Sequence, residues 1–313
     1  ALSEASESEA AEGEIEERIL IPVNNPETTD ELINLSITVK TKKNKRGLYA
    51  LNVINNDSSS VDSAAEKSAL KLLERAAVNA AATDDQLHKL LRYDLNIVNA
   101  ITSVVKEHRI TDLIMGLHHK AGISDSFLGT LTEGILTKCN TTTLIYKAVQ
   151  SLATIKRHLI AVPSNAEREI GLHFRLIKVW NIGRNTGAKL SFYGDQSTQE
   201  YIKSVHVQHP LESAFIEFED WDDYLILARD LKRDENLIII MSRKEQLSYN
   251  HSMAKVPAYL NRYFHTNNFI LVYPMQRGVD GGNGLDFLSA AVAEPFERWD
   301  DIGKTIARLF SKK

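Results

Sequence analysis

Short apolar runs alternate with helical patterns along the first half of the chain. The runs are rich in Leu, Ile and Val and lack strict alternation of apolar and polar positions. That composition is typical of strands that are covered on both faces in a parallel sheet. The runs that we predict to be strands are Ile19–Val23, Leu48–Asn55, His88–Leu95, Leu113–Gly116 and Thr142–Tyr146.

Apolar residues spaced three or four positions apart predict helices between these strands. Asn25 and Pro26 fit a cap and first turn for the first helix, and Thr28 with Glu31 is an alternative capping box. Alternation of strands and helices predicts a doubly wound α/β unit with right-handed crossovers. The apolar helical faces are Leu32, Leu35 and Val39, then Ala65, Ala69, Leu72, Ala76 and Ala80, and then Phe127, Leu131 and Ile135.

The second half of the chain repeats the pattern of the first. "RILIPVNNPE" at Arg18 resembles "RHLIAVPSNAE" at Arg157, and "DLIMGLHHK" at Asp112 resembles "NLIIIMSRK" at Asn236. "TLIYKAVQ" likewise resembles "ILVYPMQ". We therefore expect two tandem doubly wound, Rossmann-like parallel-sheet domains, at residues 18–150 and 156–276. The second set of strands is expected at His158–Val162, Ala188–Tyr193, Ser213–Phe218, Leu237–Met241 and Phe269–Tyr273.

The last predicted strands of the two halves, Thr142–Tyr146 and Phe269–Tyr273, could pair with each other. Such a pair would cover strand edges that otherwise recruit other strands. We expect it to join the halves into one compact two-lobed unit.

The two ends of the chain differ from its body. Residues 1–17 carry seven glutamates and no basic residue, which predicts a solvated acidic linker. Residues 277–313 combine a glycine hinge with an amphipathic helical stripe from Phe296 to Phe310. The simplest interpretation is a terminal helix that docks on its own domain, with another subunit or a membrane surface as alternatives.

Composition narrows the class of protein. Hydrophobic residues make up 43% of the chain and charged residues 25%, as in a soluble globular protein. The chain has 37 basic and 41 acidic residues, and without residues 1–17 it is slightly basic. It lacks a concentrated basic patch with aromatic platforms, so a nucleic-acid partner is not expected. The single cysteine, Cys139, cannot form an internal disulfide and is interpreted as a buried structural thiol. The apolar run at Leu237–Met241 is far too short to span a bilayer.

The stretch "MGLHHKAGISDSFLGT", residues 115–130, follows the fourth predicted strand. Ligands of open parallel sheets bind beyond the carboxyl ends of the strands. Phosphate binding there needs glycines, which let backbone N–H groups approach the anion, and a helix N-terminus that supplies free donors. Gly116, Gly122, Gly129 and Thr130 could supply such a loop.

The order "ILIPV…PE", "DLIMG" and the spacing from Gly116 to Thr130 resemble the universal stress protein family. In that family a G-x2-G-x9-G-(S/T) loop binds the phosphates of ATP. The resemblance covers residues 18–276 and implies a site for ATP or AMP in the first half. The residues that the resemblance assigns to this site are Val23, Asn24, Val53, Met115, Gly116, His119, Gly129, Thr130 and Leu131.

Two positions depart from the family pattern. His119 stands where the second glycine is expected, and Asn24 stands where an acidic residue usually closes the first strand. A vestigial loop is therefore the alternative to a nucleotide site. The second half has no glycine between Gly194 and Gly278, so we interpret it as a scaffold. Its basic residues Arg243, Lys244 and Lys255 are expected on a solvated face.

Other chemistry finds little support. His118 and His119 point opposite ways on an extended segment and lack further ligands, so no metal site is expected. The acidic cluster from Glu217 to Asp223 is interpreted as a strand end that passes into a helix N-terminus. The sequence shows no catalytic constellation, which places an α-hydrolase-like enzyme last among the alternatives and predicts no enzymatic activity.

The acidic linker, "SRKEQLSYN" and "NNFILVYP" together resemble the cytosolic tail of bacterial cation:proton (Na⁺/H⁺) antiporters. That resemblance implies a regulatory or sensor domain on the cytoplasmic side of the inner membrane, with an upstream membrane transport domain as its partner. The chain starts with Ala1 rather than Met, which fits this expectation. A homodimer is expected as well. The alternative is a free-standing tandem universal stress protein of the cytoplasm that binds ATP or AMP.

Overall fold

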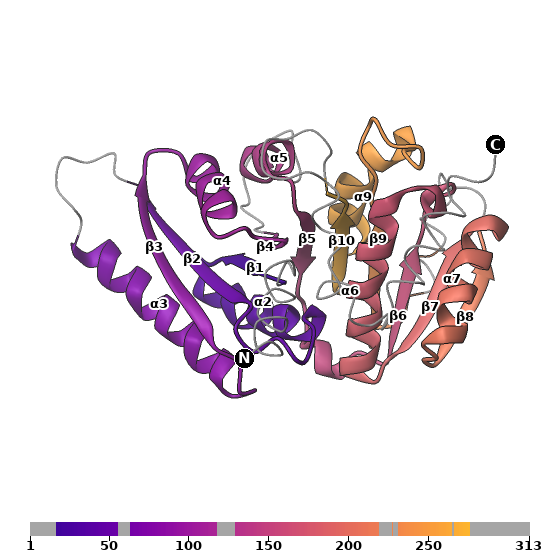
Figure 1. Ribbon diagram of the computed structural model, residues 1–313, viewed down its shortest axis with the longest axis horizontal. Coiled ribbons are helices and arrows are strands. Elements are labelled where there is room, and N and C mark those ends of the chain that lie inside the picture. Colours follow the sequence, from indigo (N-terminus) through magenta and orange to yellow (C-terminus); the bar gives the residue numbers. More distant parts are fainter. Residues whose placement is uncertain are drawn as a thin grey trace, which may run out of the picture.

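The computed structural model describes residues 17–55, 63–117, 129–218, 227, 231–264 and 266–275. Ten strands of these segments form one sheet in the order β3-β2-β1-β4-β5-β10-β9-β6-β7-β8 (Figure 1). The strands of the first half are β1 (Ile19–Pro22), β2 (Leu48–Asn55), β3 (Leu87–Asp94), β4 (Asp112–Gly116) and β5 (Thr142–Lys147). Those of the second half are β6 (Arg157–Ala161), β7 (Lys189–Gly194), β8 (Ser213–Glu217), β9 (Glu235–Ile240) and β10 (Phe269–Tyr273).

Both halves have the same strand order. In chain order within each half, the strands lie 3-2-1-4-5 across the sheet, and all pairs inside a half are parallel. The predicted α/β fold with a mostly parallel, doubly wound sheet is confirmed.

β5 and β10 join the halves as the one antiparallel pair of this sheet. Their register runs from Phe269 opposite Lys147 to Tyr273 opposite Thr143. The expected pairing of these two strands is confirmed. Because the pair is antiparallel, the carboxyl ends of the parallel strands in one half lie on the side of the amino ends in the other.

Helices cover both faces of the sheet. The helices are α2 (Pro26–Val39), α3 (Ser63–Ala81), α4 (Ile97–Glu107), α5 (Gly129–Lys138), α6 (Ile170–Thr186), α7 (Gln196–Gln208) and α9 (Val256–Tyr263). Short 3-10 turns lie at η2 (Leu152–Thr154), η3 (Ala166–Arg168) and η5 (His251–Ala254). Within the described residues, α2, α3, α6 and α7 pack on one face, and α4, α5 and α9 pack on the other.

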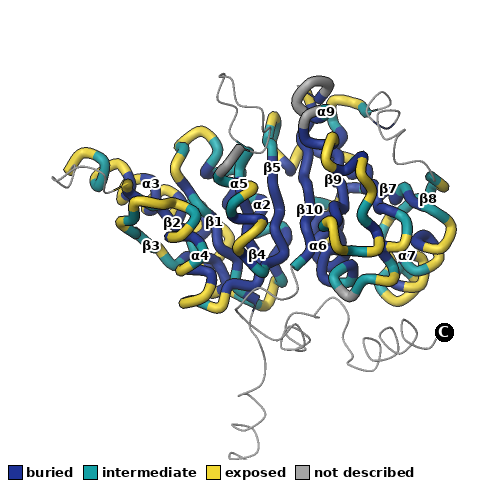
Figure 2. Tube along the Cα trace, turned by 90° about the horizontal axis from the view of Figure 1, so that it is seen from above, coloured by how far each residue is buried: buried dark blue, intermediate teal, exposed yellow. Residues whose placement is uncertain are grey.

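One apolar core cluster runs beneath α2, α3, α6 and α7 across both halves. It combines Ile21 of β1 and Leu144 of β5 with Ile160 of β6 and Ile270 of β10. Figure 2 shows the middle strands of the sheet, including β5, β10 and β9, as the most buried part of the molecule. The halves therefore share one hydrophobic core and are not two independent domains joined by a linker.

The cap of α2 is the one that the sequence predicts, whereas α4 is a first-half helix for which the sequence analysis named no apolar face. The Asn25 side chain accepts a hydrogen bond from the Glu27 N–H, and Pro26 opens the helix, so the alternative capping box at Thr28 and Glu31 is not used. α4 begins after the cap residue Asn96, whose side chain accepts from the Asn99 N–H.

Several expectations concern residues outside the described ranges. These are the linker up to residue 16, the pair His118–His119, Phe127, the acidic residues 219–223 and the C-terminal segment 277–313. Of the helices that the structure describes, none has the length and apolar character needed to cross a membrane.

Candidate functional site

The carboxyl edge of the first half gathers the described residues of the predicted nucleotide site. Val23 and Asn24 follow β1, and the N–H of Val23 donates to the carbonyl of Leu51 in β2, 2.8 Å away. Met115 and Gly116 close β4, and α5 starts at Gly129. His119 lies outside the described residues, and of Thr130 only the backbone is described. The sheet thus brings the predicted segments to one edge.

The side chains at this edge are mostly turned into the protein. Val23 and Met115 are 1% and 5% exposed, whereas Asn24 is exposed and Val53 and Leu131 are half-buried. A Cβ on Gly116 would lie 3.2 Å from Cδ1 of Leu32 on α2. Gly116 therefore has a packing role whether or not a ligand binds, because it lets α2 lie close to the end of β4.

Glu31 is a carboxylate near this edge that the sequence analysis weighed only as a capping residue. Its Oε2 is buried and has no hydrogen-bond partner among the described residues. Burial raises the pKa of Glu31, and the neighbouring Asp30 raises it further. Burial, and then the charge of Glu31, also raises the pKa of Tyr146 on β5. The first half thus has an acidic group near the edge although Asn24 replaces the expected one.

The corresponding edge of the second half is occupied by the protein's own charges. Arg175 of α6 is fully buried, and its guanidinium donates to the Met241 carbonyl just beyond β9 at 2.6 Å. It also donates to Glu169 Oε2 at 2.9 Å, while Glu169 Oε1 accepts from the Ser248 N–H. Ile240 ends β9 as Gly116 ends β4, and Met241 follows it as Leu117 follows Gly116. A paired, buried arginine therefore stands near the position where a phosphate loop would open.

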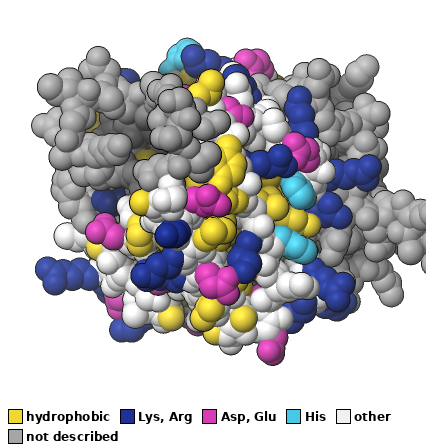
Figure 3. All heavy atoms as spheres, turned by 90° about the vertical axis from the view of Figure 1, so that its left-hand side faces the viewer, with side chains coloured by type: hydrophobic (Ala, Val, Ile, Leu, Met, Phe, Trp, Pro, Cys, Tyr) yellow, Lys and Arg dark blue, Asp and Glu magenta, His cyan; other side chains and the backbone are white. Residues whose placement is uncertain are grey.

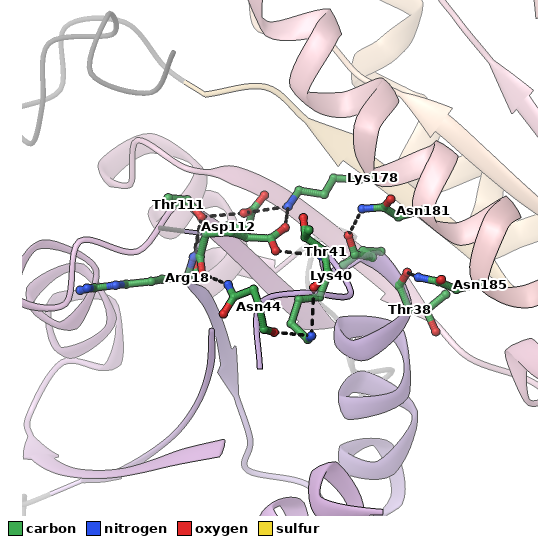
Figure 4. Close-up of polar contacts among 12 residues, drawn as sticks. Arg18, Thr38, Lys40, Thr41, Asn44, Thr111, Asp112, Lys178, Asn181 and Asn185 are labelled. Atoms are coloured by element: carbon green, nitrogen blue, oxygen red, sulfur yellow. Dashed lines mark hydrogen bonds and ion pairs between the residues drawn. The ribbon is translucent and has the colours of Figure 1, made fainter. Parts of the chain in front are cut away.

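A buried charge cluster lies at the junction of the halves (Figure 4). Lys178 of α6 donates to Glu17 Oε1 and to Asp112 Oδ2, the latter at 3.0 Å, and all three side chains are 3% exposed. Thr111 Oγ1 donates to the same Asp112 oxygen at 2.7 Å. Glu17 was expected in a solvated linker, and the structure corrects this. Its carboxylate is buried because a cation from the second half reaches it.

The turn after α2 holds the other side of Glu17. The Thr41 N–H donates to Glu17 Oε2 at 2.9 Å, and the Asn44 side chain donates to the Glu17 carbonyl. Lys40 organises this turn by donating to the carbonyls of Thr41 and Asn44, and it pairs with the buried Asp85. The chain therefore enters the first half through a fixed position.

α6 also satisfies the end of α2. Asn181 donates to the carbonyl of Val39 at 2.9 Å, and Asn185 donates to that of Thr38 at 2.7 Å (Figure 4). The last carbonyls of a helix have no partner within the helix itself. The second half therefore supplies the C-terminal cap of a first-half helix.

Two carboxylates compete for one ammonium in the junction cluster. Burial raises the pKa of Asp112, Lys178 opposes that effect, and Glu17 adds to it. Burial alone would lower the pKa of Lys178, but Asp112 and Glu17 raise it above its usual value. With both carboxylates ionised, the cluster carries one uncompensated negative charge. A small cavity with room for about one water molecule adjoins Asp112 and Lys178.

Two cations cross the junction in a reciprocal way. Arg243, after β9, donates through Nη1 to the carbonyl of Leu136 near the end of α5, and through Nε to the Pro274 carbonyl at 2.9 Å. Lys147, at the end of β5, donates to the carbonyl of Phe264 at the end of α9, 2.9 Å away. Each half therefore caps a helix of the other. Arg243 was expected on a solvated face, and this assignment is corrected, while Lys244 and Lys255 are exposed.

Other predicted chemistry is resolved in part. Cys139 is buried, as expected, and burial raises the pKa of its thiol. Among the described residues, no group of three or more His, Cys, Asp or Glu side chains could hold a metal ion.

One protein-family model matches the first half of the chain. Residues 16–147 match the model of the Universal stress protein family. The matched range begins one residue before Glu17 and ends at the last residue of β5, so it coincides with the first five-stranded unit. No curated protein matches the chain.

Two solved structures share the architecture over most of the chain. A universal stress protein from Archaeoglobus fulgidus aligns with a TM-score of 0.57 at 14% identity, over 83% of this chain and 97% of its own. The cytoplasmic domain of a prokaryotic cation chloride cotransporter aligns with a TM-score of 0.57 at 12% identity, over 90% of this chain and 100% of its own. At such identities the similarity establishes the fold.

Proposed function

We propose that this chain is the cytosolic regulatory domain of a membrane cation transporter of the cation:proton antiporter class. The observation that carries the proposal is the extent of the shared architecture. The whole cytoplasmic domain of a cation chloride cotransporter aligns with 90% of this chain, across both halves. The model of the universal stress protein family matches residues 16–147, which is the first half alone.

The junction gives this role a physical basis. In the proposed arrangement the membrane domain lies upstream, so the connection to it enters the fold at Glu17. Lys178 of the second half holds this residue. A change in the relation of the two halves would therefore act directly on the connection. The role is one of binding and regulation and not of catalysis.

The gene upstream of the codon for Ala1 provides the first test. We expect ten or more apolar segments of membrane-spanning length, about 20 residues each, in continuous reading frame. Cation-driven proton flux in membrane vesicles should then differ between the full-length protein and a variant that ends before residue 17 and so lacks residues 17–313. An initiation codon close to Ala1, or identical flux at every pH, would contradict the proposal.

We also propose that the carboxyl edge of the first half binds an adenine nucleotide, ATP or AMP, with low affinity. The start of α5 at Gly129 and the buried Oε2 atom of Glu31 support this location. Calorimetric titration with ATP, ADP and AMP, with and without Mg²⁺, should give binding heat. Gly129→Val should abolish it by blocking close approach to the backbone, whereas Thr137→Val, near the far end of α5, should not. Heat that persists in Gly129→Val would place the ligand elsewhere.

The similarity to the Archaeoglobus fulgidus protein favours a second candidate, a free-standing universal stress protein with two halves. That protein aligns over 83% of this chain. An initiation codon near Ala1 together with nucleotide binding would support this candidate over the transporter domain.

A further inference from the structure

The outer edge of β3 carries a surface that neither proposed function uses. All eight residues of β3 pair with β2, and no described strand pairs with its other side. An edge strand presents a row of backbone N–H and C=O groups that can accept another strand. The other end of the sheet offers less, because β8 has five residues and ends in the exposed Glu217.

α3 extends this surface beside β3. Lys89 forms an ion pair with Glu74, and Tyr93 hydrogen-bonds to Glu66, so the helix runs antiparallel to the strand. Leu70 lies midway between the two glutamates and is therefore level with Leu91, midway between Lys89 and Tyr93. Leu70 is 49% exposed and Tyr93 is 43% exposed. In Figure 3 this end of the molecule shows apolar side chains in its middle, among scattered charged groups.

We propose that this surface binds a second copy of the chain through antiparallel pairing of β3 with β3, centred on Leu91. A two-fold interface must be self-complementary, because each residue meets its partner twice. The proposal is independent of the transporter role and of nucleotide binding.

The charges of β3 select this register. With Leu91 opposite its own copy, His88 faces Asp94, Lys89 faces Tyr93 and Leu90 faces Arg92, each pair occurring twice. A hydrogen-bonding pair such as His88 with Asp94 and a cation beside an aromatic ring are favourable cross-strand pairs. Both neighbouring symmetric registers lose the His88–Asp94 pair. The register centred on Arg92 also places two guanidinium groups opposite each other, and like charges directly opposite each other are destabilising.

The cations of the edge are already compensated within one chain. Lys89 pairs with Glu74 of α3, and Arg92 pairs with Glu107 of α4. Charged residues on an edge strand often prevent association. Here a second copy meets ion pairs and not a row of bare positive charge, with Leu70 of both α3 helices near the two-fold axis.

The oligomeric state is the first test. Analytical ultracentrifugation of the wild-type chain should show a species of twice the 35.1 kDa chain mass. Leu70→Glu, which brings two carboxylates together near the axis, and Tyr93→Lys, which faces Lys89, should each weaken the dimer roughly tenfold or more. Val207→Glu on α7, where the side chain is 80% exposed, is the matched control and should leave the dimer intact.

A cross-link tests the register. Leu91→Cys should form an intermolecular disulfide under mild oxidation, because directly opposite Cβ atoms lie about 4.5–5.5 Å apart in antiparallel strands. Tyr93→Cys should not, because it faces Lys89. A monomeric wild-type chain, a dimer that tolerates both Leu70→Glu and Tyr93→Lys, or equal cross-linking of the two cysteine variants would overturn the proposal.

Discussion

Lys178 is a single cation that pairs with two buried carboxylates at the junction. Its ammonium compensates Glu17 and Asp112, and all three side chains are buried. Removing the single cation leaves two carboxylates without a partner in the interior. Removing one carboxylate leaves a balanced pair.

This asymmetry predicts opposite behaviour for two variants. Lys178→Met should lower the free energy of unfolding by about 3–5 kcal/mol at pH 7, because it leaves uncompensated buried charge. Asp112→Asn should leave the free energy of unfolding within about 1 kcal/mol of the wild-type value, or raise it, since the raised pKa of Asp112 already marks its charge as unfavourable. Urea denaturation at fixed pH measures both. Equal losses in the two variants would contradict the account.

His158 makes a second prediction at the scale of one residue. Its ring is buried in β6, Nδ1 lies 3.0 Å from Asn236 Nδ2, and burial lowers the pKa of His158 from 6.5 to about 4. The unfolded chain therefore binds a proton in a pH range where the folded chain does not. Stability should be complete above pH 6.5 and fall as the pH drops toward 4, by up to about 3 kcal/mol.

The slope of unfolding free energy against pH between 6.5 and 4 should become shallower in His158→Leu. His251→Asn, at an exposed position, serves as the control and should keep the wild-type slope. Part of the slope should remain in His158→Leu, because burial also lowers the pKa of His173 to about 4. An unchanged slope in the His158 variant would refute this assignment.

At the scale of elements, α5 and α9 each end against a cation from the opposite half. Arg243→Gln should raise the rate of amide hydrogen exchange in the last turn of α5 and lower stability by about 1–3 kcal/mol, through loss of a charge-assisted hydrogen bond. The control Lys244→Gln, at the exposed neighbouring position, should leave both the exchange rate and the stability unchanged. If exchange rises equally in the two variants, Arg243 has no special role at α5.

The elements were largely predictable from sequence, whereas the cross-half contacts were not. Every strand boundary was predicted to within two residues, because the apolar runs are short and clearly bounded. The β5–β10 pairing was predicted as a way to cover strand edges, and the structure shows it. Glu17 was misjudged because its neighbours are acidic and its partner, Lys178, lies 161 residues away. Arg175 and Arg243 have no local pattern that distinguishes them from surface arginines.

The nucleotide-site residues remain a prediction from the family pattern. The sheet brings Val23, Asn24, Met115 and Gly116 to one edge, as the strand order requires. The spacing of these residues along the chain could not predict that the Glu31 carboxylate is partly buried near the same edge, because its burial depends on the way α2 packs near β5.

At the scale of the whole molecule, the sheet and one core cluster are continuous across both halves. Neither half can unfold without exposing the apolar surface of the other. We therefore expect a single cooperative thermal transition, with the calorimetric enthalpy equal to the van't Hoff enthalpy. Differential scanning calorimetry measures both. Two resolved transitions, or a calorimetric enthalpy well above the van't Hoff value, would show that the halves unfold separately.

Because β5 and β10 belong to one chain, their interface does not have to be symmetric. Between two identical subunits, any substitution at such an interface occurs twice, so a cation placed on one side must tolerate its own copy on the other. Within one chain, Lys178 can lie on α6 without a second lysine on α2. Likewise, Arg243 of one half and Lys147 of the other can bind carbonyl groups from positions that are not equivalent. Dilution cannot separate the partners either, because they are always present at the high effective concentration set by their own linker. One half can therefore change its sequence while the other keeps its own.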